Sequence, residues 1–516
     1  MAPVPISFFS GINFKKAGGY TSFYLLSSLF DCALLSAQDA PPKNIELPEV
    51  QIILPPETVA KPKADSSQQN SASAQVAQAD KAASGKVDQA KTETAVEQPK
   101  VKPGDSVQGM PGTGTTGING YVASGTSTAT KTNTPILDIP QSITIITKKE
   151  AEDRGSQTLG EVLRYVPGIT VAQGEGHRDQ ITIRGQNTTA SFFVDGVRDD
   201  VEYFRDLYNV DVIEVLKGPD AMIFGRGGGG GIVNRVTKKA NGERIREATV
   251  TSGSYNRART TVDVGDKISP DAAFRFNTMY EYSESFRDYF DLQRYGFNPT
   301  LAFRPNDNTK ISLSYEYFKD DRVVDRGVPS FIGTPGRPSN GPIEDFFGNP
   351  NVSQSDFEGQ SATATLEHRT ESGVNIRNHT FLATYDKVYS NTFANSPVTF
   401  PGSCGDLSGC VTLGGYKNGT QRDTAVNQTD VTYLWDMGNG IRHTFLGGAE
   451  FSYQETENYR NNASFGLPGT LSFVVPFDYP TTFVPVFYDQ FQRDWNTEVS
   501  TYSAYIQDQL EITKYF

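Results

Sequence analysis

The sequence predicts a mainly β protein in which a mixed α+β unit precedes a long series of antiparallel strands. From residue 247 onward, segments that alternate apolar and polar residues recur about ten times, as expected of strands with two different faces. The connections between them alternate in length, from the short turn at 304–308 to the long segment at 320–356. Residues 135–240 instead combine one helical pattern with short strands, within the usual size of a domain.

The first 37 residues predict a secretory signal peptide. Lys15 and Lys16 precede an apolar stretch at 20–35, and Ser36-Ala37 offers a small-residue cleavage site. Asp31 interrupts the apolar stretch, which leaves the cleavage point open. We therefore expect the mature chain to begin near residue 38.

Residues 38–134 predict an extended segment followed by a tether. The run at 44–53 is short, apolar and flanked by proline pairs. Beyond it, residues 55–134 are rich in Ala, Gln, Ser, Lys and Thr and then in Gly and Thr. Because such a composition cannot bury a core, this part is expected to be disordered.

The α+β unit shows one helix and several short strands. Thr158 and Glu161 have the spacing of a capping box, and Pro167-Gly168 ends the helix. Asp195-Gly196 predicts a tight hairpin turn. The strands are expected at 138–147, 169–171, 180–184, 192–197, 212–216 and 232–237.

A glycine-rich turn separates the last two of these strands. Gly225, Gly227 and Gly230 satisfy the G-x-G-x-x-G pattern of dinucleotide-binding folds. The residues after the glycines have the pattern of a strand rather than a helix, so no helix N-terminus would face a phosphate. A turn between strands is the better interpretation.

Several motifs resemble, in order, the plug domain of TonB-dependent outer-membrane receptors: PQSITIIT, LRYVPGI, IRG, FFVDGVRDD, EVLKGP, FGRGGGGGIVN and VTKK. The resemblance implies a plug at 135–240 and, at 241–516, the first part of an antiparallel transmembrane β-barrel of the 22-stranded plugged type. No apolar run of about 18 residues occurs, and a closed barrel is the other way to cross a bilayer. The 32 Phe and 24 Tyr suit aromatic girdles, although they also suit a soluble β-sandwich.

The resemblance also implies a TonB box within the apolar run near the N-terminus. An isolated strand there can add to the sheet edge of a partner protein. The alternative is a linker with some β propensity. The residues concerned are Leu47, Pro48, Glu49, Val50, Gln51 and Ile52.

In this family, a plug arginine in IRG and a basic residue before GP face glutamates on the barrel wall. Arg184 and Lys217 match those positions, so the resemblance implies plug–barrel contacts there. Lys217 replaces the arginine of some members, which puts a bidentate contact in doubt. The alternative is that both residues only cap strand ends.

The resemblance places a ligand-facing apex in the plug loops at 172–179 and 186–191, with 198–205 as a weaker candidate. Arginines there suit an anionic ferric complex, and aromatic rings can stack on catechols. The candidates are His177, Arg178, Asn187, Arg198, Tyr203, Phe204 and Arg205. The four histidines form no cluster by spacing, so iron is expected to arrive already chelated, with no metal site or cofactor in the protein.

The resemblance implies a receptor that binds a ferric siderophore, of catecholate rather than hydroxamate type. It would import the siderophore with TonB and the inner-membrane energy-transducing complex. A haem or cobalamin receptor is the alternative within the class, and a secreted β-rich adhesin or carbohydrate-binding protein is the alternative outside it. No nucleophile, base and orienting group recur in a motif, so an enzyme is not expected. The net charge of -13 argues against nucleic acid.

Two expectations concern the second half of the chain. Cys404 and Cys410 are the only pair left once Cys32 departs with the signal peptide, so they are expected to form a disulfide in the long loop between two strands. The ten or so strands are fewer than the about 22 of this class of barrel. The sequence therefore reads as a receptor truncated within its barrel, whose open sheet would leave two unpaired edges.

Overall fold

The computed structural model describes residues 13–16, 19–22, 115–116, 118–218, 229–334, 336–402, 404–406, 408–438 and 440–512. The chain divides into two compact units, Met1–Lys100 and Val101–Phe516. In the first, β1 (Asn13–Lys16) and β2 (Gly19–Ser22) pair antiparallel. Most of the expected signal peptide, the TonB-box residues 47–52 and the glycines at 225–228 lie outside the described residues.

The second unit contains a five-stranded sheet in the order β11-β10-β13-β12-β6. Its strands are β6 (Ser142–Thr147), β10 (Phe192–Val194), β11 (Val197–Arg198), β12 (Val210–Lys217) and β13 (Gly231–Thr237). Only β10 and β13 run parallel. The strand expected from residue 138 begins at Ser142, because a 3-10 turn, η1 (Ile136–Asp138), comes first. β12 and β13 pair as the glycine turn between them predicts.

Two short helices cover this sheet. The capping box at α3 (Leu159–Leu163) is present: the Thr158 side chain accepts from the Glu161 backbone, and the Glu161 carboxylate accepts from the Thr158 backbone. Leu159, Val162 and Leu163 of this helix are fully buried in the main core of the unit. Sequence reasoning missed α2 (Lys148–Asp153), whose cap is Thr147.

Two small three-stranded sheets complete this part of the fold. One consists of β7 (Ile169–Ala172), β8 (Gln180–Ile183) and β9 (Gln186–Thr188), with η2 (Gly174–Gly176) between β7 and β8. The other consists of β3 (Thr115–Thr116), β4 (Gly125–Thr126) and β5 (Thr134–Pro135). The expectation that disorder extends to residue 134 is therefore wrong for 118–134. The hydroxyl of Thr126, fully buried, donates to Glu214 at 2.6 Å, which composition does not reveal.

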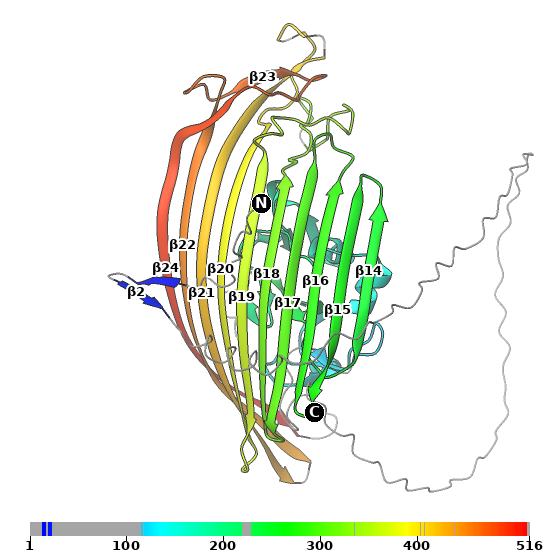
Figure 1. The fold of residues 1–516 in the computed structure, drawn as a ribbon, viewed down its shortest axis with the longest axis vertical. Coiled ribbons are helices and arrows are strands. Elements are labelled where there is room, and N and C mark those ends of the chain that lie inside the picture. Colours follow the sequence, from blue (N-terminus) through cyan, green and yellow to red (C-terminus); the bar gives the residue numbers. More distant parts are fainter. Residues whose placement is uncertain are drawn as a thin grey trace, which may run out of the picture. The chain divides into compact units, whose positions relative to one another are not determined.

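The rest of the unit is one antiparallel sheet, whose long strands lie side by side in chain order (Figure 1). Its ten-strand path consists of β14 (Ile245–Gly253), β15 (Arg257–Ser269), β16 (Ala272–Glu284), β17 (Asp291–Asn306), β18 (Thr309–Val323), β19 (Gln354–Arg369), β20 (Val374–Ala394), β21 (Cys410–Gly438), β22 (Ile441–Phe465) and β24 (Val486–Glu511). The short β23 (Phe473–Pro476) pairs with β21 off that path. Every strand expected after residue 247 lies in this sheet. No helix in the described residues is both long and apolar enough to cross a membrane.

The large sheet is polar on the face toward the plug and apolar on the other face, which is the reverse of the arrangement in a soluble protein. The face toward the plug is polar, with Arg275 and Glu281 of β16 buried there. The other face exposes large apolar and aromatic residues, including Tyr280, Leu301 and Phe303. A polar inside and an apolar outside are typical of strands that face lipid.

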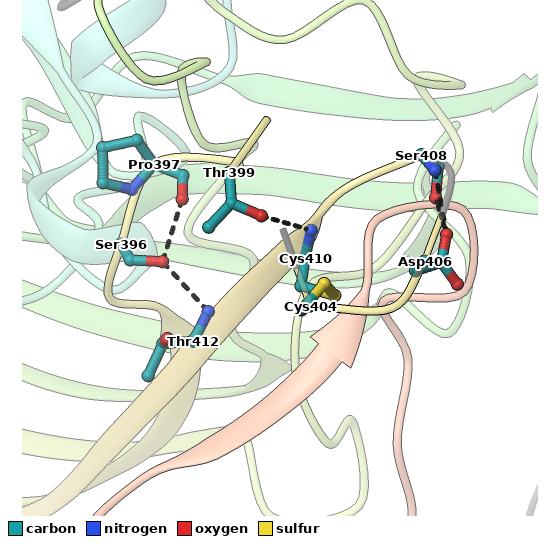
Figure 2. The surroundings of a disulfide bond; sticks show 8 residues. All are labelled: Ser396, Pro397, Thr399, Cys404, Asp406, Ser408, Cys410 and Thr412. Carbon is teal, nitrogen blue, oxygen red and sulfur yellow. Dashed lines mark hydrogen bonds between the residues drawn. A yellow bond between two sulfur atoms is a disulfide. The ribbon is translucent and has the colours of Figure 1, made fainter. Parts of the chain in front are cut away.

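The long connections at one end of the large sheet share a core of their own. Val398, Val411, Phe465 and Phe477 are buried together there. Cys404 and Cys410 are joined by a disulfide with their Cα atoms 6.3 Å apart (Figure 2). Cys410 is the first residue of β21. The expectation that both cysteines lie in the loop is therefore correct for Cys404 and wrong for Cys410.

Candidate functional site

The plug loop at 173–178 has an unusual backbone at the end of the sheet that carries the long connections. Gly174, Glu175 and Gly176 all adopt the left-handed region, with φ of 48°, 62° and 81°. A Cβ on Gly176 would lie 2.3 Å from the backbone oxygen of Asp325, just beyond β18. Only glycine therefore permits this close approach of plug and sheet.

Glu175 connects this loop to three strands or strand ends of the sheet. Its carboxylate accepts a 2.5 Å hydrogen bond from the Tyr416 hydroxyl, and its backbone oxygen accepts one from the Tyr389 hydroxyl at 3.1 Å. The Arg326 guanidinium lies 3.4 Å from the same carboxylate. Hydrogen bonding from His177 and Tyr416, together with the charges of Arg326 and Arg178, lowers the pKa of Glu175 to about 2. The carboxylate is therefore ionised at neutral pH.

Guanidinium groups and aromatic rings surround Glu175. Arg326 lies over the Phe393 ring at 3.9 Å, and Arg460 lies over the Tyr416 ring at 3.4 Å. The Nε atoms of Arg178 and Arg460 are buried with no hydrogen-bond partner in the described part of the chain. We call this set the apical cluster; it consists of Glu175, Arg178, Arg326, Tyr389, Phe393, Tyr416 and Arg460. Fixed cations beside aromatic faces suit an anionic aromatic ligand.

His177 lies beneath the apical cluster and is 5% exposed. Its Nδ1 atom accepts from the Lys387 ammonium at 2.5 Å, and its ring packs on Tyr389 with centroids 3.8 Å apart. Burial, reinforced by the charge of Lys387, lowers the pKa of His177 well below its usual value. His177 is therefore a neutral residue packed beneath the apex, and its contact with a ligand stays a prediction.

Two further ligand candidates belong to the interior of the plug. The Arg205 guanidinium is 1% exposed and donates to Asp199 and to the backbone oxygens of Val201 and Tyr203. Tyr203 donates to Asp199 at 2.9 Å and stacks on Phe357 of β19 at 4.3 Å. The polar atoms of both residues are thus engaged within the plug, and Tyr203 also packs on the sheet. Their contact with a ligand stays a prediction.

The remaining candidates lie nearer the surface. Arg178 belongs to the apical cluster and donates to Glu202 at 3.1 Å. Asn187 is exposed on β9 and accepts from Gln180. Arg198 lies over Phe193, and Phe204 lies under Arg322 of β18. The structure thus places only Arg178 among the basic and aromatic groups of the apex.

Plug and sheet are joined by buried ion pairs at positions that sequence reasoning did not single out. Asp206 accepts from both terminal nitrogens of Arg259 at 2.8 Å and lies 3.2 Å from Arg294. Lys238 lies 3.0 Å from Asp263 of β15. Nearby, α2 and β12 border a cavity of about 740 Å³ against β14 and β15.

Arg184 and Lys217 are the two plug residues expected to face barrel glutamates. Lys217 donates to the Thr144 hydroxyl and the Pro167 backbone oxygen, both within the plug, at 3.2 Å. Arg184 is exposed, with a positive φ of 48°. Within the residues described, neither forms an ion pair with a carboxylate of the sheet. Their role toward a barrel wall stays a prediction.

Sequence reasoning missed the sheet side of the apical cluster. Tyr389, Tyr416 and Arg460 come from β20, β21 and β22, and Arg326 follows β18. The available signal was aromatic and basic residues close to the long connections. Among the residues that the structure covers, no three or more His, Cys, Asp or Glu side chains gather in a way that could hold a metal ion.

Comparisons with known proteins agree with this architecture. Residues 135–232 match the family model of the TonB-dependent Receptor Plug Domain. The chain is 31% identical to the probable TonB-dependent receptor BfrD of Bordetella pertussis, over 62% of this chain and 44% of BfrD. It is 28% identical to the catecholate siderophore receptor Fiu of Escherichia coli K12, over 75% of this chain and 52% of Fiu.

A solved structure shares the fold as well. The crystal structure of the ferric-catecholate import receptor Fiu from E. coli K12, in its open form, aligns with a TM-score of 0.64 and 26% identity, covering 74% of this chain and 58% of that one. The chain spans about half the length of the curated relatives it matches. With its plug domain, its antiparallel sheet of inverted polarity and these relatives, the chain is similar to TonB-dependent receptors across the plug and the strands that follow it.

Proposed function

We propose that this protein binds a ferric siderophore at the outer surface and imports it, and that the ligand is of catecholate type. The observation that carries the proposal is the apical cluster, in which Arg326 and Arg460 lie over the rings of Phe393 and Tyr416. Arg178 lies near the same Glu175 carboxylate as Arg326. Ferric catecholates are anionic and aromatic, so they match both features of this site. The relatives named for catecholate receptors support the same ligand class.

Import would depend on TonB and the inner-membrane complex that drives it. The plug contacts the sheet in part through hydrogen bonds and ion pairs, such as Asp206 with Arg259 and Lys238 with Asp263. Polar interfaces exchange their bonds for water at low net cost, which allows a pulled plug to rearrange. We propose residues 47–52 as the segment on which TonB acts by strand addition.

The test is binding and uptake of a set of purified ferric siderophores by cells that carry this receptor as their sole iron importer. We expect a ferric tris-catecholate to bind and to support growth only while the proton-motive force is intact. Arg326→Gln should weaken binding by about tenfold, because a charge-assisted contact is lost. Binding of haem or cobalamin instead of any ferric siderophore would contradict the proposal.

A further inference from the structure

Glu175 occupies the position in the apical cluster that best suits an anion from outside. Its carboxylate lies 3.4 Å from Arg326, 3.9 Å from Arg178 and 2.5 Å from the Tyr416 hydroxyl. Among the residues described, no other carboxylate contacts all three of these groups. The side chain is 36% exposed, so it is reachable from solvent.

The loop that carries Glu175 is held in a strained shape. A non-glycine residue is disfavoured in the left-handed region because its Cβ crowds the backbone, and Glu175 has φ 62° and ψ 21°. The contacts that offset this strain come from the sheet, through Tyr389, Tyr416 and Arg326. If the carboxylate is displaced, the loop loses its contacts with Tyr416 and Arg326, and the strained backbone can then relax.

We propose that Glu175 is an internal anion that holds the apical cluster and the plug loop closed, and that an anionic ferric chelate binds by displacing it. This inference rests on the proposed function and adds a residue that sets affinity and transmits occupancy to the plug. Displacement exchanges one anion for another on the same guanidinium groups, so no buried charge is left unpaired. The free energy that keeps the loop closed lowers the apparent affinity for ligand.

The experiment measures the dissociation constant of a trianionic ferric tris-catecholate for the protein in detergent. Glu175→Gln keeps the size of the side chain and removes its charge, so binding should tighten by about threefold to tenfold. Because the gain is electrostatic, it should shrink as salt is raised. Unchanged or weaker binding in Glu175→Gln overturns the proposal.

Glu202→Gln is the matched control. It removes the same charge from the same plug, but among the residues described the Glu202 carboxylate contacts only Arg178 of the apical cluster. We expect its affinity to stay within about twofold of wild type, as for an ordinary partly exposed pair. Equal tightening in both variants would assign the effect to net charge and overturn a specific role for Glu175.

A second measurement, whose comparison of variants needs no ligand, separates the two proposals. Amide hydrogen exchange of residues 173–178 should be faster in Glu175→Gln and in Tyr416→Phe than in wild type, since each variant removes a bond that holds the loop. In wild type, adding the chelate should also speed this exchange. Unchanged exchange in both variants overturns the proposed role of Glu175. A wild-type protein that binds no ferric catecholate instead contradicts the proposed function and leaves the exchange test intact.

Discussion

Asp206 of the plug and Arg259 of β15 form a two-pronged pair, with both Asp206 oxygens accepting from the guanidinium at 2.8 Å. Arg259 also donates to Glu281 at 2.6 Å, and Glu281 accepts from Arg294. All four side chains are at most 5% exposed. This network is the most deeply buried charged link between the plug and the sheet among the residues described.

Asp206→Asn should destabilise the protein by about 3 to 5 kcal/mol, because it leaves two buried guanidinium groups short of a charge partner. The measurement is the free energy of unfolding in denaturant. Asp153→Asn is the matched control, since Asp153 pairs with Lys149 on the surface of α2. Its effect should stay within about 0.5 kcal/mol, and an equal loss in both variants would contradict the buried link.

The same pair predicts how stability depends on pH. Burial raises the pKa of Asp206, but the charges of Arg259 and Arg294 outweigh it, so the net pKa is lowered. The stability that Asp206 contributes is therefore complete above about pH 4, the usual carboxyl range, and is lost as pH falls below it. The difference in Tm between wild type and Asp206→Asn should shrink from pH 6 to about pH 3. A difference that stays constant would assign the effect to something other than this titration.

The disulfide between Cys404 and Cys410 should be present in the protein from cells. The segment that precedes the disulfide ring is tied to β21 by hydrogen bonds from the Cys410 and Thr412 backbones to the hydroxyls of Thr399 and Ser396 (Figure 2). Because the ring is small, its loss should cost at most about 2 kcal/mol. Mass spectrometry of the unreduced protein should find the cross-linked peptide, and two free thiols would refute the pairing.

Val50→Pro should abolish uptake while leaving ligand binding at the cell surface unchanged. The proline removes a backbone donor from a strand that must add to a partner sheet. Surface binding of a radiolabelled ferric siderophore is measured at low temperature, and its uptake is measured separately. Comparing the two values separates the two steps. Val59→Pro, in the low-complexity tether, is the control and should keep uptake. Normal uptake by Val50→Pro would place the coupling segment elsewhere.

Local patterns in the sequence determined the elements and their order. Alternation predicted the strands of the large sheet, Thr158 and Glu161 predicted the capped start of α3, and Asp195-Gly196 predicted the β10–β11 turn. Each of these depends on contacts between residues close in the chain, or on which face of a strand is buried. Such rules can be read without knowing what the other face meets.

Tertiary structure alone decided which residues meet between plug and sheet. Glu175 and Tyr416 are 241 residues apart, and the ordered Thr126 reaches Glu214 across 88. Alternation predicts which side chains of a strand share a face, but not how far the plug sits along the strands or which loop it brings opposite. That placement is set by the sum of many contacts distant in sequence, which is why Arg205 became a buried packing residue and Glu175 became the centre of the apex.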